Sequence, residues 1–543
     1  MTSIETLLTP AVNCVMANMP AANCVMAKMP TLPRRASVIW SIAGSDNSAG
    51  AGIQADLKTA QSFSSPTQPL HLCTIITAVT AQHSAGVDGC VAMSPSLLRQ
   101  QAAALLQEQT PVAIKIGLLV NAAQVQWLSE LLAQLRAQSP ELLVVYDPVA
   151  ISSSGTNMAE PDLYQAVSQY LLPVLDIITP NLPEFVALTQ CEALAQGAQV
   201  LFARGVKALI VKGGHGRDVA HCNDQLFVSA DFRYRGYPAY CDNVLLQSDR
   251  QPHRFNHGTG CSFSSALTAA LALGYPLEDA FVLAKSYVNQ GLAQPVVVNQ
   301  HAGTLAHNGF VRDPQYLPKL LSSVINKPTA AFLPLTAPLG LYVIVSSVTE
   351  LLRALAAGVT SIQLRIKSRD QHYLQVQIQQ AIQYCRLKEV QLFINDHWQL
   401  AITYGAYGVH LGQEDLETAD LMALQKAGIR LGISNHGFYK LLRAQQLQPS
   451  YLAIGAVFST QTKDMAGKIQ GLDKLRHYVE LFNSTPLVAI GGINEHNAAA
   501  VLATGIKHLA VAQAFASAPQ PEQWVSQMRA LWHPANKEVE NAE

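Results

Sequence analysis

The stretch LYVIV, residues 341–345, is the first of eight short apolar runs that recur through the C-terminal part of this 543-residue chain. Helix-period stretches lie between several of these runs, as where Leu374, Ile378 and Ile382 repeat every four residues. Eight β/α units in roughly 200 residues predict a compact (β/α)8 TIM barrel. The other seven runs are SIQLRI from 361, QLFI from 391, GVHL from 408, IRLGI from 429, YLAIG from 451, LVAIG from 487 and HLAVA from 508.

Polar residues follow nearly all of these runs. In a TIM barrel the chemistry lies at the C-terminal ends of the strands, so we expect these residues to meet at one rim. Their basic side chains and a glycine pair that lets backbone N–H groups approach favour a polyanionic ligand. Asp396 and Asp415 follow adjacent strands and would share one hard cation, so a magnesium diphosphate is the expected ligand. The rim residues are Gln363, Arg365, Lys367, Asn395, Asp396, Gln413, Glu414, Asp415, Ser434, Thr460, Thr462, Lys463, Gly491 and Gly492.

Five motifs give this half a family resemblance. QLRIK, FINDHWQLA, GVHLGQEDL, AIGAVFSTQTK and VAIGGI, in this order, resemble thiamine-phosphate synthase over residues 339–535. The resemblance implies that the barrel joins hydroxymethylpyrimidine diphosphate to thiazole phosphate, which yields thiamine phosphate and releases diphosphate. It implies that Asp396 and Asp415 hold Mg²⁺. It assigns the pyrimidine diphosphate to Gln363, Leu364, Arg365, Ile366, Lys367, Asn395, Ser434 and Lys463, and the thiazole phosphate to Thr460, Gln461, Thr462, Gly492, Ala512 and Gln513.

One departure and one alternative qualify this resemblance. The family usually has a serine in a VVS segment where this chain reads VAQ, with Ala512 and Gln513, so we expect the phosphate to meet backbone N–H groups there. The alternative is a thiazole tautomerase-like or purely phosphate-binding barrel. The paired aspartates and the STQTK segment argue against it, since an isomerase needs no metal-bound diphosphate.

The N-terminal part shows an α/β rhythm from Val38 onward, because apolar runs alternate with longer amphipathic stretches. We expect mostly parallel strands covered on both faces, in a three-layer α/β/α domain over residues 37–310. A proline-rich connector follows at 311–338, with one helix expected near Leu317–Val324. The apolar runs are 37–44, 74–79, 113–119, 142–147, 176–178 and 208–213.

Glycine-rich loops follow the strands of this domain, although GxxxxGK[ST] is absent and a P-loop kinase is therefore not supported. AGSDNSAGAG (43–52) follows the first strand and VKGGHG (211–216) follows the last parallel one. HGTGC (257–261) opens a helix rich in serine and alanine. Several N–H groups at the start of that helix would point at one spot, which favours an anion hole. The alternative without a ligand is that Thr259 caps the helix and that the Cys261 side chain only packs against its neighbours.

The motifs AGSD, AGAGIQADLK, TAVTAQ, KIGLL, YDPV, TPNLPE, VKGGH and HGTGC together resemble hydroxymethylpyrimidine kinase/phosphomethylpyrimidine kinase, of the ribokinase-like superfamily, over about residues 38–300. The resemblance implies two phosphorylations from ATP at one site, and their product is the diphosphate that the barrel consumes. It assigns the pyrimidine to Gln82 and Asp56, the magnesium-ATP side to Asn181, Glu184, Lys212 and Asp147, and the catalytic anion hole to Gly258, Thr259, Gly260 and Cys261.

Alternatives stay open at several of these kinase residues. Asp56 could equally be a charge on the surface of a helix, without a role in binding. Lys212 could simply cap the end of the sheet instead of meeting a nucleotide phosphate. Asn47 and Ala49 stand where the family usually has proline and glycine, and the segment between Lys58 and Thr77 is longer than usual. Pyridoxal kinase, from the same superfamily, is the nearest rival, and HGTGC with Gln82 favours the pyrimidine enzyme.

Cys261 is expected to act as the base that takes the substrate hydroxyl proton. The nine cysteines are scattered without a CxxC or a Cys/His cluster, which argues against a disulfide or a zinc site. Phosphoryl transfer needs no covalent cysteine intermediate. At a helix N-terminus the dipole should lower the pKa of the Cys261 thiol and favour thiolate.

The remaining predictions concern the ends of the chain and its surroundings. Residues 1–36, with a tandem repeat at 12–30, are expected to be an extension without catalytic role, and 536–543 a tail. A net charge of -1 gives no reason to expect nucleic acid or an anionic membrane as a partner. We expect a cytoplasmic enzyme with small-molecule substrates and a homodimer through the kinase half. A scaffold with decayed sites is disfavoured, because both halves keep polar residues at their expected catalytic ends.

Overall fold

The computed structural model describes residues 35–83, 86–149, 158–216, 218–235, 237–252, 255–300, 302–321, 328, 330–459 and 469–532. The tandem repeat at 12–30 and the tail at 536–543 lie outside the described residues. So do four predicted site residues of the barrel, Thr460, Gln461, Thr462 and Lys463.

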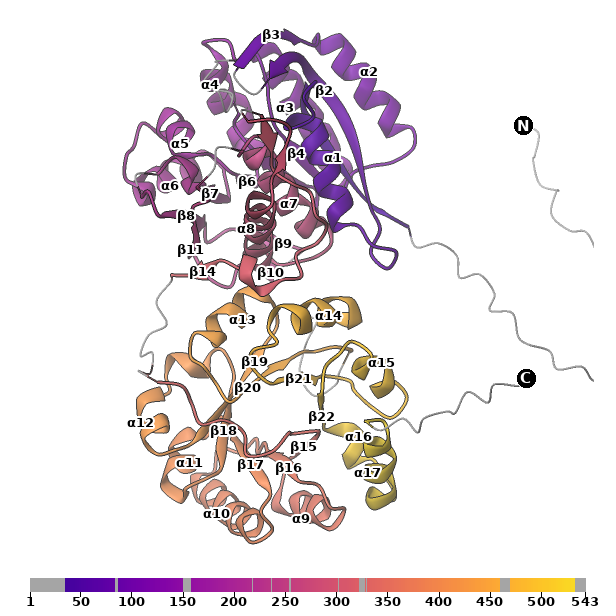
Figure 1. Cartoon of the computed structure of the whole chain (residues 1–543), viewed down its shortest axis with the longest axis vertical. Helices are drawn as coiled ribbons and strands as arrows, with labels where there is room; N and C mark the ends of the chain where they lie inside the picture. Colours follow the sequence, from indigo (N-terminus) through magenta and orange to yellow (C-terminus); the bar gives the residue numbers. More distant parts are fainter. Residues whose placement is uncertain are drawn as a thin grey trace, which may run out of the picture. The chain divides into compact units, whose positions relative to one another are not determined.

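A ten-stranded sheet forms the centre of the N-terminal domain, in the order β14-β11-β8-β7-β6-β5-β4-β1-β2-β3 (Figure 1). The six strands from β7 to β2 are parallel, as the apolar runs predict. They are β1 Ser37–Asp46, β2 Leu70–His83, β4 Ala113–Ile116, β5 Leu143–Tyr146, β6 Ile177–Ile178 and β7 Ala208–Val211. The antiparallel strands are β3 Gly86–Ala92, β8 His221–Val228, β11 Asn243–Asp249 and β14 Lys319–Leu320, of which β3 and β14 form the two edges. Two small ribbons pair β9 Arg233–Tyr234 with β10 Tyr237–Pro238 and β12 Val296–Val297 with β13 Gly303–Thr304.

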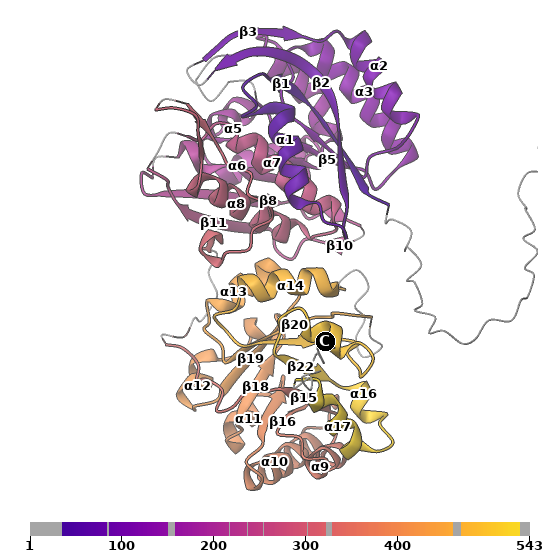
Figure 2. The ribbon, with the colours of Figure 1, turned by 45° about the vertical axis from the view of Figure 1, so that its right-hand side comes forward.

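Helices cover both faces of this sheet, so the three-layer α/β/α prediction is confirmed (Figure 2). Neighbouring residues of β1 point to opposite faces: Ile39 packs with one helix layer, and Trp40 packs with the other. One layer holds α1 Gly52–Phe63, α7 Thr259–Ala272 and α8 Leu277–Ala293. The other holds α2 Pro95–Leu106, α3 Ala122–Gln138, α4 Leu163–Ala166, α5 Leu182–Thr189 and α6 Leu194–Ala203.

The helix expected near Leu317–Val324 is wrong in its described part. Lys319 and Leu320 form β14, which pairs antiparallel with β11 through Leu246 and Leu320. Leu320 is buried by this pairing, so a place at the edge of the sheet satisfies both its backbone and its side chain. Residues 322–327 lie outside the described part of the chain.

The C-terminal domain is a closed barrel of eight parallel strands, so the (β/α)8 prediction is confirmed (Figure 1). Each of the eight apolar runs forms one strand. They are β15 Leu341–Val345, β16 Ser361–Leu364, β17 Gln391–Asn395, β18 Gly408–Leu411, β19 Arg430–Asn435, β20 Tyr451–Ile454, β21 Leu487–Ile490 and β22 His508–Val511. The surrounding helices are α9 Val348–Ala356, α10 Gln371–Leu387, α11 Trp398–Tyr404, α12 Leu421–Lys426, α13 Phe438–Gln445, α14 Gly471–Leu481, α15 Ala498–Leu502, α16 Gln513–Ala516 and α17 Pro521–Ala530.

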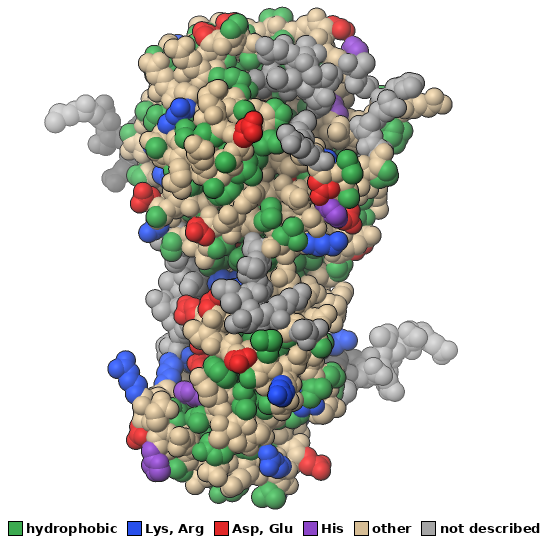
Figure 3. Space-filling view, turned by 90° about the vertical axis from the view of Figure 1, so that its left-hand side faces the viewer, with side chains coloured by type: hydrophobic (Ala, Val, Ile, Leu, Met, Phe, Trp, Pro, Cys, Tyr) green, Lys and Arg blue, Asp and Glu red, His purple; other side chains and the backbone are tan. Residues whose placement is uncertain are grey.

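Among the helices of the described residues, none is long and apolar enough to cross a bilayer. On the face that Figure 3 shows, acidic and basic side chains are interspersed among neutral ones instead of gathering into one basic patch. This distribution agrees with the net charge of -1.

Candidate active sites

Asp46 ties the first glycine-rich loop of the N-terminal domain to the HGTGC segment. At the end of β1, its carboxylate accepts hydrogen bonds from the backbone N–H of Ser48 (2.8 Å) and Ala51 (2.8 Å) and from Nε2 of His257 (2.8 Å). Burial raises the pKa of Asp46, but the hydrogen bonds from His257 and Ser48 outweigh burial and hold that pKa well below its usual range. The two loops are therefore held together by one ionised carboxylate.

Glycine is required where these two loops touch. Gly258 has φ +82°, and a Cβ on it would lie 1.8 Å from the carbonyl oxygen of Gly50. A Cβ on Gly50 would lie 2.2 Å from the ring of His257. Backbone therefore packs directly on backbone, which places the first turn of α7 beside the loop that follows β1.

Two buried ion pairs flank the N-terminus of α7. Lys115, on β4, contacts both carboxylate oxygens of Asp56 at 3.0 and 2.9 Å. Lys212, after β7, forms an ion pair with Asp147, after β5. Burial alone would lower the pKa of each lysine, but the paired carboxylate outweighs it and raises that pKa, so both lysines are charged.

Helix α7 binds both ion pairs through consecutive serines. Ser264 donates to Asp147 Oδ2 (3.2 Å), and Ser265 donates to Asp56 Oδ1 (2.6 Å). A Cβ on Gly260 would lie 3.2 Å from Lys212 Nζ, so the second pair lies next to the first turn of the helix. Helix geometry leaves the N–H groups of Gly260 and Cys261 without an acceptor inside the helix. The site thus combines backbone donors that have no acceptor inside the helix, the positive end of a helix dipole and the adjacent Lys212 cation, which together suit a phosphate.

The two predicted pyrimidine residues have different surroundings. Gln82 is half-buried near the end of β2, and its Nε2 is 3.4 Å from His257 Nε2. Asp56 is not a helix-surface charge: it is fully buried and also accepts a hydrogen bond from Ser41 Oγ (2.5 Å). Its oxygens are occupied by protein donors.

Asn181 and Glu184, predicted on the ATP side, form a reciprocal capping box at the start of α5. The Asn181 side chain accepts from the Glu184 backbone (2.9 Å), and the Glu184 side chain accepts from the Asn181 backbone (2.8 Å). Glu184 is also buried near Lys212 and Asp147. Burial raises the pKa of Glu184 to about 7, with the Lys212 cation opposing and the Asp147 carboxylate adding to that rise.

The predicted thiolate of Cys261 is wrong for the free protein. Burial raises the pKa of its thiol to about 11, and the nearby Asp56 and Asp147 carboxylates add to the rise, although Lys115 opposes it. At pH 7 roughly one thiol in 10⁴ is then ionised. The helix dipole does not offset burial here, so the free protein holds Cys261 as a neutral thiol.

At the rim of the barrel the two predicted metal ligands lie together. Asp396 has φ +63°, a strained conformation for a non-glycine residue, and directly follows β17. The pKa of Asp396 is raised by burial and then by the neighbouring Asp415 carboxylate, while Arg365 opposes the rise. Asp415 also accepts a hydrogen bond from the backbone N–H of Gly412 (3.0 Å).

These carboxylates fit one Mg²⁺ only with help from a ligand. The described residues contain no group of three or more His, Cys, Asp or Glu arranged to hold a metal ion. Mg²⁺ binds in proteins through one or two carboxylates together with waters and substrate phosphates. Burial and the neighbouring Asp415 carboxylate raise the pKa of Asp396, and a hard cation bound between the two carboxylates would stabilise their charged forms.

The residues predicted for the pyrimidine diphosphate differ in what they can offer. Gln363 and Asn395 are buried at the ends of β16 and β17, and Lys367 is exposed. Leu364 packs in the hydrophobic core, so only its backbone is available, and half-buried Ile366 packs against the same core. Ser434 lies at the end of β19, where its Oγ is 2.7 Å from His410 Nε2. Burial lowers the pKa of His410 to about 3, so its imidazole is neutral at pH 7.

On the predicted thiazole side the described residues include two glycines whose backbone approaches a neighbouring loop closely. Gly491 and Gly492 have φ +102° and +66°, and a Cβ on Gly492 would lie 2.5 Å from the Ser459 carbonyl oxygen. Gln513 is exposed and donates to Ser517 (3.0 Å) along its own helix, with Ala512 as the N-cap of α16. The Gln513 side chain is thus used locally, as the departure from the family pattern led us to expect. The roles of Thr460, Gln461, Thr462 and Lys463 stay predictions.

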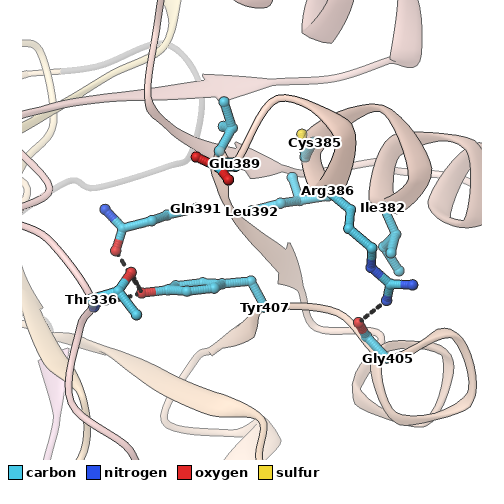
Figure 4. Close-up of a pocket in the computed structure, with 10 residues that line it drawn as sticks. Thr336, Ile382, Cys385, Arg386, Glu389, Gln391, Leu392, Gly405 and Tyr407 are labelled. Atoms are coloured by element: carbon cyan, nitrogen blue, oxygen red, sulfur yellow. Dashed lines mark hydrogen bonds between the residues drawn. The ribbon is translucent and has the colours of Figure 1, made fainter.

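A pocket of the barrel lies at the N-terminal ends of strands β17 and β18, opposite the rim that carries the predicted site residues (Figure 4). It is lined by the start of β17, by Arg386 and Glu389 near the end of α10, and by Tyr407, which precedes β18. Tyr407 OH donates to Gln391 (2.6 Å), and Arg386 donates to the Gly405 carbonyl (2.9 Å), as Figure 4 shows. None of the predicted site residues lines this pocket.

The sequence reading missed several polar residues that organise the two sites. Lys115 stands within the apolar run AIKIGLL and His410 within GVHL, and a polar residue in a strand covered on both faces signals a buried partner. Asp46 and His257 belong to the motifs AGSD and HGTGC, in which the glycines are the stronger signal. Ser264 and Ser265 carry no distinctive signal in a serine-rich helix.

The two folds and sites define a class: a chain of two α/β enzymes, one with a helix-terminal anion hole and one with a barrel rim of cations and paired carboxylates. Comparisons identify both parts. The family model for phosphomethylpyrimidine kinase matches residues 46–306, and that for thiamine monophosphate synthase matches residues 341–515.

Individual relatives cover the barrel alone or nearly the whole chain. A thiamine-phosphate synthase of Neisseria meningitidis serogroup A is 50% identical over 201 residues, which are 37% of this chain and 98% of that protein. A probable chloroplastic thiamine biosynthetic bifunctional enzyme of Oryza sativa subsp. japonica is 30% identical over 482 residues, 87% of this chain and 84% of that protein. A structure of Staphylococcus aureus pyridoxal kinase with pyridoxal has 27% identity and a TM-score of 0.43, and covers 51% of this chain and 95% of its own.

The chain therefore belongs to the bifunctional thiamine biosynthetic enzymes, which join a phosphomethylpyrimidine kinase to a thiamine-phosphate synthase. The predicted function and both enzyme activities are confirmed at this level.

Proposed function

We propose that the two domains catalyse consecutive steps, with the product of the first as the substrate of the second. The kinase domain, residues 37–310, would phosphorylate hydroxymethylpyrimidine and then its monophosphate, each time from ATP. The synthase barrel, residues 339–535, would condense the resulting diphosphate with thiazole phosphate. The observation that carries the kinase assignment is the N-terminus of α7, which lies between two buried ion pairs.

In the kinase domain, positioning and charge would do most of the work. Phosphoryl transfer passes through a loose transition state whose charge spreads over the transferred oxygens. The N–H groups of Gly260 and Cys261 would donate to these oxygens, with Lys212 as the nearest cation. Because Cys261 is a neutral thiol in the free protein, we assign the catalytic effect to its backbone and to Gly258, Thr259 and Gly260. Gln82 would pair with the aminopyrimidine edge, since its amide offers both a donor and an acceptor.

Asn181, Glu184 and Asp147 would shape the ATP side of the kinase site indirectly. The capping box fixes the start of α5, and Asp147 holds Lys212 in place. Asp56 would orient the pyrimidine side through Ser265 and Lys115.

In the barrel, cations would stabilise the departing diphosphate. Arg365, Lys367 and Lys463 would neutralise its developing charge, and Gln363, Asn395 and Ser434 would hold the pyrimidine portion. Asp396 and Asp415 would hold Mg²⁺, which when bound would supply further positive charge to the diphosphate oxygens. Backbone N–H groups at Gly492, Ala512 and Gln513, with Thr460, Gln461 and Thr462, would bind the thiazole phosphate.

The deciding experiment supplies the full chain with hydroxymethylpyrimidine, ATP, Mg²⁺ and thiazole phosphate. We expect thiamine phosphate to form, and omission of ATP should abolish it unless the pyrimidine diphosphate is supplied directly. Asp396→Ala should remove Mg²⁺-dependent diphosphate release while ATP-dependent phosphorylation continues. Full synthase activity in this variant would overturn the metal assignment.

Pyridoxal provides the control for substrate choice. We expect the kinase domain to prefer hydroxymethylpyrimidine over pyridoxal, and turnover of pyridoxal alone would contradict that choice. We further propose a cytoplasmic enzyme that dimerises through its kinase domain, which sedimentation of the full chain would test.

A further inference from the structure

A continuous hydrogen-bonded chain of five side chains runs through the core of the barrel. Gln363 Nε2 is 3.2 Å from Tyr342 OH, and Tyr342 OH is 2.9 Å from Tyr451 OH. Tyr451 OH is 2.7 Å from His410 Nδ1, and His410 Nε2 is 2.7 Å from Ser434 Oγ. The residues come from five different strands, β16, β15, β20, β18 and β19. The chain thus connects two residues that our proposal places against the pyrimidine diphosphate, Gln363 and Ser434.

Because most of these side chains are buried, their hydrogen-bond donors need acceptors within the chain. Gln363, Tyr342, Tyr451 and His410 are between 0% and 4% exposed. A buried polar group that lacks a partner costs free energy, so each donor here must find an acceptor. The His410 and Tyr451 rings also lie nearly parallel, 5.6 Å apart and inclined by 22°, which limits the freedom of the imidazole.

One direction of donation satisfies the whole chain. The Gln363 amide donates to Tyr342, so Tyr342 gives its single hydroxyl hydrogen to Tyr451. Tyr451 in turn gives its hydrogen to Nδ1 of His410. A neutral imidazole that accepts at Nδ1 carries its hydrogen on Nε2, and it donates this hydrogen to Ser434 Oγ. The hydroxyl hydrogen of Ser434 is then left free for a ligand.

We propose that His410, Tyr451 and Tyr342 are positioning residues that fix the Ser434 hydroxyl as a hydrogen-bond donor to the pyrimidine diphosphate. None of the three needs to touch the substrate. The same direction uses an N–H of Gln363 and leaves its carbonyl oxygen as an acceptor. The site would therefore present one donor and one acceptor, which complements an aminopyrimidine edge with its amino hydrogen and ring nitrogen. This inference rests on the proposed role of Ser434 in the synthase site.

The first test is a mutant cycle in the full chain. Tyr451→Phe removes the hydroxyl that connects the phenols to His410 and preserves the ring. Losing one oriented hydrogen bond should raise the KM for the pyrimidine diphosphate about tenfold, with a smaller change in kcat. In a Ser434→Ala background the same substitution should raise KM no further, because the oriented hydroxyl is already absent. Tyr407→Phe, which removes a phenol hydroxyl at the other end of the barrel, should leave KM unchanged.

The second test reads the imidazole directly. In chain labelled with ¹⁵N-histidine, with His410 assigned by difference against His410→Asn, the ¹⁵N shifts should show hydrogen on Nε2 and none on Nδ1. In Tyr451→Phe the two nitrogens should move toward a mixture of tautomers, since Nδ1 has lost its donor. The calorimetric transition of the barrel in each variant serves as the folding control.

The outcomes separate the inference from the proposal beneath it. If Ser434→Ala leaves KM unchanged, Ser434 does not bind the substrate and the proposed site is wrong. If Ser434→Ala raises KM but Tyr451→Phe has no effect, or has the same effect in both backgrounds, the positioning role is wrong. Hydrogen on Nδ1 of His410 in the unaltered chain would also overturn it.

Discussion

Replacing Lys115 with methionine should destabilise the kinase domain strongly. Lys115 is 1% exposed and Asp56 is 0% exposed, so the substitution leaves a carboxylate buried without its cation. Breaking a buried pair in this way costs about 3–5 kcal/mol. The Ser41 and Ser265 hydroxyls still donate to Asp56, so we expect the lower part of that range. For a domain of this size that corresponds to a fall in Tm of about 6–12 °C.

A second substitution tests the cause. In Lys115→Met with Asp56→Asn the buried charge is gone, so most of the lost stability should return. The assay is differential scanning calorimetry of the full chain, with the transition of the barrel as the internal reference. Synthase activity, measured with pyrimidine diphosphate supplied, should equal that of the unaltered chain in both variants. The reasoning is refuted if the double variant is as unstable as Lys115→Met, since the unpaired carboxylate would then not be the source of the loss.

Three further predictions use the same two-activity chain. Gly258→Ala should reduce kinase turnover at least about a hundredfold, because its Cβ would clash with Gly50, whereas Gly214→Ala, with no atom within 4 Å of the added Cβ, should retain it in the same ATP assay. Alkylation of Cys261, followed by peptide mass spectrometry, should accelerate about tenfold per pH unit from pH 7 to 9, and a plateau below pH 8 would contradict a thiol pKa of about 11. The raised pKa of Glu184, about 7, means that the folded state binds this proton more tightly than the unfolded state does. The free energy of unfolding should therefore fall as pH rises from about 4.5 to 7, by up to about 1.4 kcal/mol per pH unit. Glu184→Gln should flatten this pH dependence in thermal melts.

Much of the fold could be predicted because strands covered on both faces read as continuous apolar runs. All eight barrel strands appear in this way, as do the six parallel strands of the kinase sheet. The antiparallel strands β3, β8 and β11 escaped because they are not continuous apolar runs: HCNDQLFV, for example, mixes polar and apolar residues. β14 escaped because two residues that pair at an edge leave no periodic signal.

Whether a site residue could be predicted depended on whether topology or a long-range contact places it in the site. Motifs at strand ends point to Asp396, Asp415 and Ser434 because topology alone brings strand ends together, whereas HGTGC is indicated by its glycines at the start of a helix. The pairing of Lys115 with Asp56 spans 59 residues, and no spacing rule connects a strand residue with a helix residue at that distance. The thiol of Cys261 shows the limit of local reasoning, since a helix N-terminus suggested a low pKa and burial produced a high one.

The two sites treat charge in opposite ways, and this difference has a consequence for ligand binding. In the kinase domain Asp56 and Asp147 are each already paired with a lysine and a serine hydroxyl, so this part of the site is organised before substrate arrives. At the barrel rim burial and the neighbouring Asp415 carboxylate raise the pKa of Asp396. A ligand that brings positive charge to the rim would relieve the repulsion between these two carboxylates, whereas Asp56 and Asp147 already have their cations. Because a ligand stabilises the state that it binds, a cation bound with diphosphate at this rim, as we propose, would also stabilise the folded barrel.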